Sequence, residues 1–190
     1  MTDTLRILGF AGSLRRASFN RGLLRAAVEA APSGIAVETF DLAPIPPYNA
    51  DVEAEGDPEP VAALKERIVG ADALLIVTPE ANYSIPGVLK NAIDWASRPP
   101  QSAFEGKPIA LAGATPGGFG TVRAQLALRQ VFVFTNSYVL PKPELWVSRA
   151  RERFDEAGNL VDDRVRTELR ALLEALAAFA RRLGSGTISE

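Results

Sequence analysis

Residues 12–20 read Gly-Ser-Leu-Arg-Arg-Ala-Ser-Phe-Asn. They follow a short apolar run, 5–10, and precede a segment whose apolar residues recur at helical spacing: Leu23, Leu24, Ala27, Val28 and Ala31. This order predicts a strand, a turn and an α-helix. The N-terminus of that helix has unpaired N–H groups and the positive end of the helix dipole, so the turn favours an anion.

The side chains of this turn suit a phosphate group. One glycine lets the main chain approach a ligand, two hydroxyls can hydrogen-bond it, and two guanidinium groups bring positive charge: Gly12, Ser13, Ser18, Arg15 and Arg16. Arg15 is the expected phosphate contact, whereas we interpret Arg16 as a solvated surface charge. Asn20 is expected to cap the helix.

The composition is that of a single globular domain. The 190 residues are 47% hydrophobic and 23% charged, and the net charge is −2. A chain of this length can bury a sizeable core, so we expect one domain over 1–183 and a flexible tail over 184–190. The small net charge gives no electrostatic case for a nucleic-acid partner. With no signal-peptide pattern and no run of about 18 apolar residues, we expect a cytoplasmic protein without a membrane partner.

The chain contains neither cysteine nor histidine. Disulfides, thiolate nucleophiles, protein-ligated iron–sulfur clusters and Ser-His-Asp triads are therefore excluded. The acidic residues between 51 and 59 lack the fixed spacing of a cation site, so we predict no metal. Any chemistry must come from carboxylates, hydroxyls, lysine, arginine or a bound cofactor.

Strand-like and helical patterns alternate along the chain. Strands are expected at 5–10, 35–40, 73–77, 107–112 and 137–140, and the helices after the first at 61–69, 86–96, 121–134 and 161–183. This alternation favours an α/β fold, with a five-stranded parallel sheet between two layers of helices. Two segments are assigned no element: 41–60, either a solvated connection or a functional lid, and 141–158, expected to be irregular.

Three unusual loops follow the first, third and fourth expected strands. In the flavodoxin-like strand order 2-1-3-4-5 these strands are neighbours, and ligands bind at their carboxyl ends. The loops 12–20, 79–84 and 113–120 would then meet. The first suits phosphate, the second offers an amide and backbone donors to the edge of a flat heterocycle, and the glycines of the third let the main chain lie against a planar face. FMN fits this description.

Three motifs in matching order resemble the NADPH-dependent FMN reductase family, which includes bacterial chromate and quinone reductases. They are residues 12–20, Thr78-Pro-Glu-Ala-Asn-Tyr-Ser-Ile-Pro-Gly87 and Leu89-Lys-Asn-Ala-Ile-Asp-Trp95. The likeness spans roughly residues 5–180. It implies a flavodoxin-like three-layer α/β/α sandwich and bound FMN. It also implies hydride transfer from NADPH or NADH, through flavin N5, to small acceptors such as quinones, free flavins or metal oxyanions like chromate.

The resemblance also implies a set of cofactor-binding residues. Those around the FMN phosphate would be Ser13, Arg15, Ser18, Phe19 and Asn20. Those along the isoalloxazine would be Pro79, Glu80, Ala81, Asn82 and Tyr83, with Thr115, Gly117 and Gly118 on its other side. Ala81 departs from the family, which often has an aromatic residue there. No residue is predicted to be catalytic, because the flavin carries the chemistry.

Two further questions concern partners. A flavodoxin-type electron carrier that docks to redox proteins is the alternative to an enzyme, although a net charge of −2 is weak for such docking. The resemblance implies dimers or tetramers, and in some relatives an Arg and a Glu that match Arg123 and Glu144 meet across subunits. The apolar helix end at 131–134 also favours a homodimer or homotetramer, and so does Trp95, which falls off its helix's apolar stripe and is expected to pack in a subunit contact or in the core.

Overall fold

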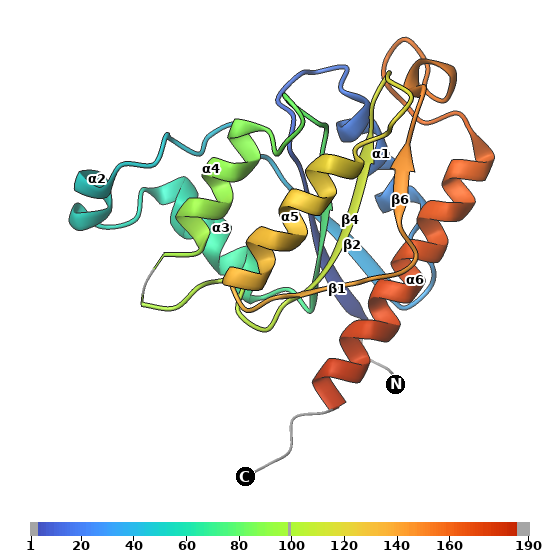
Figure 1. The fold of residues 1–190 in the computed structure, drawn as a ribbon. Helices are drawn as coiled ribbons and strands as arrows, with labels where there is room; N and C mark the ends of the chain where they lie inside the picture. The colour runs from blue at the N-terminus through green and yellow to red at the C-terminus, as the bar shows by residue number, and fades with distance from the viewer. Residues whose placement is uncertain (1–3, 99, 186–190) are drawn as a thin grey trace.

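The computed structural model describes residues 4–98 and 100–185 and contains one parallel sheet (Figure 1). The sheet order is β2-β1-β3-β4-β5, with β6 also paired to β4. The strands are β1 Leu5–Ala11, β2 Ile35–Phe40, β3 Ala73–Val77, β4 Pro108–Ala114, β5 Tyr138–Val139 and β6 Leu145–Val147. The predicted flavodoxin-like α/β fold is confirmed.

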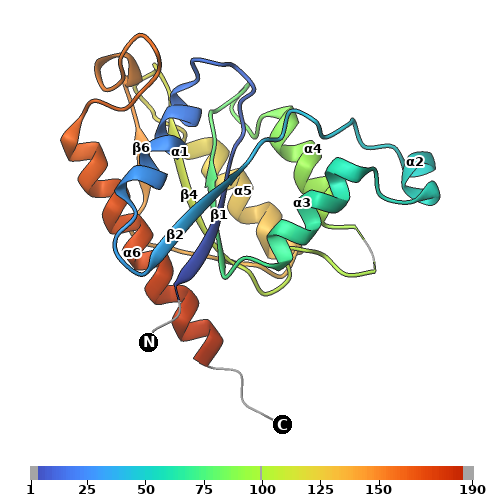
Figure 2. The ribbon, with the colours of Figure 1, turned by 180° about the vertical axis from the view of Figure 1, so that it is seen from behind.

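Helices cover both faces of this sheet (Figures 1 and 2). They are α1 Phe19–Ala30, α2 Ala50–Glu55, α3 Glu59–Val69, α4 Gly87–Ala96, α5 Val122–Phe134 and α6 Asp163–Ser185, with a short 3₁₀ helix, η1, at Ala150–Glu152. Of the tail predicted at 184–190, Gly184 and Ser185 belong to α6, and 186–190 lie outside the described residues.

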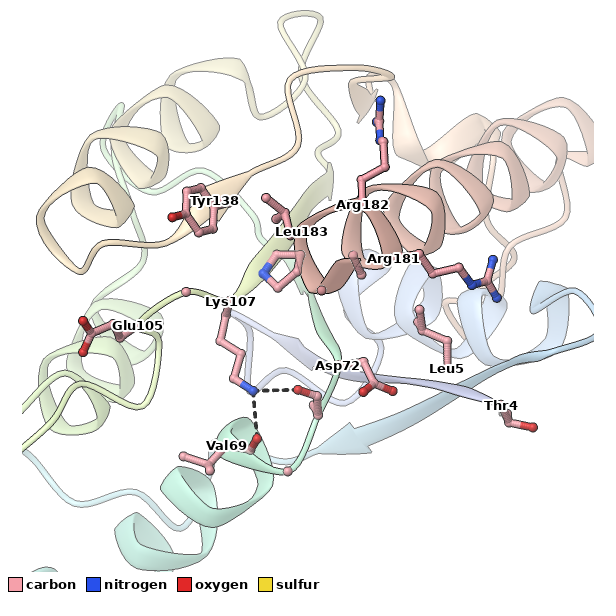
Figure 3. Close-up of a pocket in the computed structure, with 16 residues that line it drawn as sticks. Thr4, Leu5, Val69, Asp72, Glu105, Lys107, Tyr138, Arg181, Arg182 and Leu183 are labelled. Carbon is pink, nitrogen blue, oxygen red and sulfur yellow. Dashed lines mark hydrogen bonds between the residues drawn. The ribbon is translucent and has the colours of Figure 1, made fainter. Parts of the chain in front are cut away.

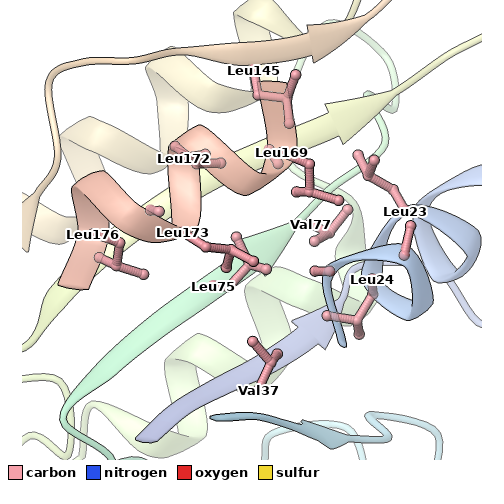
Figure 4. Close-up of a cluster of buried hydrophobic side chains, with 14 of the residues drawn as sticks. Leu23, Leu24, Val37, Leu75, Val77, Leu145, Leu169, Leu172, Leu173 and Leu176 are labelled. Carbon is pink, nitrogen blue, oxygen red and sulfur yellow. The ribbon is translucent and has the colours of Figure 1, made fainter. Parts of the chain in front are cut away.

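Two apolar layers hold the helices to the sheet. Every residue of β3 is buried, as its continuous apolar run predicts for a central strand. On one face, α1 and α6 pack their leucines against β3 (Figure 4). On the other face, α3, α4 and α5 pack against the alternate side chains of the same strands. This packing fixes where each strand ends, and therefore where each loop begins.

The fifth position of the sheet is filled by two short strands instead of one. β5 pairs with the start of β4, and β6 pairs with its end, where Ala112–Ala114 face Leu145–Val147. Pro141 and Pro143 lie between them, and proline interrupts a strand because it has no N–H to donate. The prediction of an irregular 141–158 is wrong on this point, and the sheet has six strands instead of five.

The acidic segment 41–60 is fastened to α4. Trp95 is fully buried, donates its Nε1–H to the carbonyl of Pro46 at 2.9 Å, and meets the Tyr48 ring edge-on at 5.0 Å. Glu53 of α2 accepts hydrogen bonds from Arg98 and Tyr48. Trp95 therefore packs within its own chain, and the interpretation of Trp95 as a sign of subunit contact is wrong.

One glycine contact joins α1 to the connection between β6 and α6. A Cβ atom on Gly22 would lie 1.8 Å from the carbonyl oxygen of Gly158. Gly22→Ala is expected to lower the free energy of unfolding by about 1–3 kcal/mol, because the backbone must shift to relieve the overlap. Urea unfolding measures this change.

Gly87→Ala is the matched control, because nothing lies within 4 Å of its Cβ position at the start of α4. It should leave stability unchanged or raise it by about 0.4–1 kcal/mol. Equal stabilities for the two variants would contradict the close packing of Gly22 on Gly158.

Candidate functional site

The carboxyl ends of β1, β3 and β4 lie side by side. The N–H of Gly12 donates to the carbonyl of Val77 at 2.9 Å, and the N–H of Thr78 donates to that of Ala112 at 2.9 Å. The three loops that follow these strands therefore begin at one edge of the sheet. This edge is where open α/β sheets bind their ligands.

A cavity of about 410 Å³ opens at this edge, a volume within the usual range of ligand pockets. Its lining includes these predicted site residues: Ser13, Arg15, Ser18, Phe19, Asn20, Pro79, Glu80 and Thr115. The other predicted residues are exposed and outside the lining: Ala81, Asn82, Tyr83, Gly117 and Gly118. The structure thus brings predicted residues from all three loops into one cavity, while five of the predicted residues lie outside it.

The β1–α1 loop presents polar groups that have few or no partners in the described chain. Ser18 is the N-cap of α1, and its Oγ accepts the N–H of Asn20 at 3.2 Å, which leaves its own hydroxyl hydrogen to donate. Ser13 makes no hydrogen bond with any described residue. The Arg15 guanidinium lies 5.5 Å from the centre of the Phe19 ring and makes no hydrogen bond or ion pair with any described residue. These groups remain available to an anion.

Asn20 is not the helix cap that the sequence suggested. Its side chain donates to the carbonyl of Ala114 at 2.9 Å and accepts the N–H of Ala114 at 2.8 Å. The residue is 3% exposed, and the pair connects the first turn of α1 to the end of β4. Asn20 therefore holds two walls of the cavity together.

The β3–α4 loop turns sharply at its tip. Ala81 and Ser84 exchange backbone hydrogen bonds of 3.0 and 2.8 Å around Asn82 and Tyr83, which both have positive φ angles. Two such residues form a type I′ turn. The turn holds the Tyr83 ring in solvent, where 74% of the residue is exposed.

Arg123 connects this turn to the β4–α5 loop. Its guanidinium lies 3.7 Å from the centre of the Tyr83 ring and 5.4 Å from that of Phe119. It also pairs with the carboxylate of Glu80. The hydrogen bond from the Arg123 guanidinium to the Glu80 carboxylate is the main reason why the pKa of Arg123 is raised.

Glu80 is occupied by structural contacts. Besides the ion pair, its Oε2 accepts the backbone N–H groups of Arg123 and Ala124 at 3.0 and 3.3 Å, and so caps α5. Its side chain is only 8% exposed. Glu144, by contrast, pairs with Lys142 and lies 4.0 Å from Arg129. Within one chain, therefore, the partner of Arg123 is Glu80.

Glycines in these loops serve two different purposes. A Cβ on Gly12 would come within 3.2 Å of Leu89 and Thr78, and one on Gly113 would lie 2.3 Å from the carbonyl oxygen of Thr78. Both glycines therefore allow protein packing, whereas the sequence had suggested ligand approach at both positions. Nothing lies within 4 Å of the Cβ position of Gly118, so the main chain there is open to a ligand.

Sequence reasoning missed one charged residue in the lining. Arg151 reaches the cavity from η1, in the segment that was expected to be irregular. It belongs to no local motif, and the chain has 21 lysines and arginines. Only the pairing of β6 with β4, a contact between distant segments, brings it to the site.

A second cavity, of about 830 Å³, lies at the opposite, amino end of the strands (Figure 3). Lys107 reaches into it and donates to the carbonyls of Val69 and Ala71 at 2.8 and 2.7 Å. Burial lowers the pKa of Lys107. Although this cavity is larger, it lies at the amino ends of the strands, whereas open α/β sheets bind ligands at the carboxyl ends. The carboxyl-edge cavity is the better candidate.

The fold and this cavity define a flavodoxin-like protein with a polar cavity at the carboxyl ends of its neighbouring strands β1, β3 and β4. The family model of NADPH-dependent FMN reductases matches residues 5–152. An NAD(P)H-dependent FMN reductase of Pseudomonas aeruginosa is 50% identical over 183 residues, which is 96% of this chain and 99% of that protein. A quinone reductase of Escherichia coli K12 is 40% identical over 186 residues, 96% and 99% of the two chains.

A solved structure agrees with these matches. FerB, a flavoenzyme NAD(P)H:(acceptor) oxidoreductase from Paracoccus denitrificans, superimposes with a TM-score of 0.84 at 32% identity. The match covers 94% of this chain and 98% of FerB. The chain belongs to the NADPH-dependent FMN reductase family.

Substitutions of Asn20 and Ser13 are expected to have different effects on stability, because only Asn20 is bonded within the described chain. Asn20→Leu leaves the buried N–H and C=O of Ala114 without partners, so the free energy of unfolding should fall by about 2–5 kcal/mol. Ser13→Ala should change it by less than about 0.5 kcal/mol, because Ser13 has no hydrogen bond with the described chain. Urea unfolding without added flavin tests both, and an Asn20→Leu variant as stable as Ser13→Ala would refute the bridging role.

Proposed function

We propose that this protein is an FMN-dependent NAD(P)H oxidoreductase that reduces quinones, free flavins or similar small acceptors. One observation supports the proposal: residues from the loops after β1, β3 and β4 line a single cavity at the carboxyl edge of the sheet, with hydroxyl and guanidinium groups that suit a phosphate. Membership of the FMN reductase family and the names of the relatives, which include quinone reductases, support it. Metal oxyanions such as chromate are a further acceptor class that we propose.

The residues present fit FMN. Ser13, Arg15 and Ser18 would bind the phosphate, because their hydroxyls and guanidinium have no competing carboxylate in the part of the chain that the structure describes. Phe19 supports Arg15 through its ring. The phosphate would also lie at the N-terminus of α1, where the helix dipole favours an anion.

The flat ring would lie between the two other loops. The turn at 79–83 would border one side, and Thr115, Gly117 and Gly118 the other. The absence of a side chain at Gly118 leaves room for close approach of the main chain. Arg123 and Glu80 would hold these two loops at a fixed separation, since Arg123 contacts both exposed aromatic rings and Glu80 caps the following helix.

Bound FMN would supply the hydride and electron transfer that a chain without histidine or cysteine cannot perform itself. The protein's part is to bind, orient and shield the ring, and backbone N–H groups near its edge would stabilise negative charge. Tyr83 and Phe119, which are 74% and 77% exposed, would border the opening through which nicotinamide and then the acceptor would enter. Ala81 is small and leaves this entrance wider than an aromatic residue would.

Turnover distinguishes this proposal from a flavodoxin-type electron carrier. Purified protein with FMN is expected to oxidise NADPH or NADH in a steady state when a quinone is added. Absorbance at the nicotinamide band follows the reaction, and FMN alone without protein is the control. If the protein binds FMN but none of the acceptors supports NAD(P)H oxidation, the electron-carrier alternative is favoured.

The proposal includes a homodimer or homotetramer and a cytoplasmic location, where NAD(P)H is available. No helix in the described part of the chain is long and apolar enough to cross a membrane.

Val133 and Phe134 at the end of α5 are 79% and 89% exposed, an apolar surface that a second subunit would cover. Sedimentation at micromolar concentration should show the oligomer, and a monomer would refute it.

A further inference from the structure

We propose that Arg151 is a second phosphate-binding residue, which makes the site select FMN over unphosphorylated riboflavin. This inference rests on the proposed function and deepens it. It assigns a role to the connection between β6 and α6, a fourth segment at the cavity besides the three loops.

The connection is tied to the β4–α5 loop by main-chain hydrogen bonds. Thr115 donates to the carbonyl of Val147 at 2.9 Å and accepts from the N–H of Ala150 at 3.0 Å. Arg149, in the left-handed conformation, donates its N–H to Gly117 at 3.1 Å. Ala150 is fully buried. The backbone on the N-terminal side of Arg151 is therefore fixed relative to one wall of the cavity.

The same connection packs on α1, beside the phosphate loop (Figures 1 and 2). The rings of Phe154 and Phe19 are 5.2 Å apart, and Phe154 is 5% exposed. Gly158 fits against Gly22, and its carbonyl accepts a hydrogen bond from Arg25 at 3.1 Å. Arg151 therefore stands between two anchored points, and little conformational freedom is left for its backbone to lose on binding a ligand.

Charge points to an anion as the ligand of Arg151. Its neighbour Arg153 pairs with Asp162 at 2.5 Å, but Arg151 makes no ion pair or hydrogen bond with any described residue. Arg15, in the same cavity lining, also lacks a carboxylate partner. The acidic residue of that lining, Glu80, is already neutralised by Arg123.

Two unpaired guanidinium groups in one cavity suit a dianion. Each can form a charge-assisted hydrogen bond with a phosphate oxygen, and such bonds are about twice as strong as neutral ones. Riboflavin has a hydroxyl at the position of the FMN phosphate and gains no ion pairing. Arg151 should therefore strengthen FMN binding and leave riboflavin binding unchanged.

The test is a fluorescence titration of the flavin-free protein with FMN and with riboflavin. Arg151→Ala is expected to raise the Kd for FMN about ten-fold, with less than about a two-fold change for riboflavin. Arg151→Lys keeps the positive charge, so its Kd for FMN should rise less than that of Arg151→Ala. Arg15→Ala should weaken FMN binding in the same selective way. Added salt should weaken FMN binding less in Arg151→Ala than in the wild type, because one charge contact is gone.

Arg16→Ala is the matched control. Arg16 is an exposed arginine of the phosphate loop that lies outside the cavity lining and has no partner in the described chain. Its removal changes the net charge by the same amount as removal of Arg151, and it should leave the FMN Kd within about two-fold. Thermal unfolding of each variant checks that the fold is kept.

Each other outcome has a definite meaning. Unchanged FMN affinity in Arg151→Ala overturns the inference, and so does an equal loss for FMN and riboflavin, which would indicate a structural effect. A raised KM for NADPH with unchanged FMN affinity would assign Arg151 to the nicotinamide cofactor instead. If the wild-type protein binds neither flavin, the proposed function itself fails, whereas FMN binding that is insensitive to Arg151 removes only this inference.

Discussion

Asn20 and Ala114 exchange two buried hydrogen bonds that join the first turn of α1 to the end of β4. The geometry of the candidate site depends on this pair, because it sets the distance between the loop proposed to bind phosphate and the loop proposed to border the ring. Groups buried in this way are costly to leave without partners, so the two loops cannot drift apart without loss of stability. Arg123 and Glu80 impose a similar constraint on the loops after β3 and β4.

The polar residues of the site divide into two groups with different tasks. Asn20, Glu80 and Arg123 are occupied by contacts within the protein and hold the loops in place. Ser13, Arg15 and Arg151 line the cavity without hydrogen bonds or ion pairs to the described chain. The first group gives the second a fixed position, so little ordering is needed when a ligand binds. This division suits a protein whose role is to hold a reactive cofactor.

Local patterns in the sequence predict the parts of this molecule that local interactions determine. The apolar run at 73–77 identifies the central strand, and the pattern around 12–20 identifies the turn between β1 and α1. Asn20 could not be assigned in this way, because its partner lies 94 residues away. β6 has only three residues, and its pairing with β4 brings Arg151 to the cavity. Trp95 was misjudged because Pro46 and Tyr48, which cover it, lie in the segment 41–60, to which the sequence assigned no element.

The central claim is that loops from three neighbouring strands, and the connection after β6, enclose one FMN molecule. Amide hydrogen exchange with and without FMN tests it most directly. The account predicts slower exchange on FMN addition at 12–20, 79–84, 113–120 and 148–152, with no change around Lys107 at the amino edge. Protection confined to the Lys107 cavity, or exchange unchanged in the four segments while FMN is bound, would contradict it.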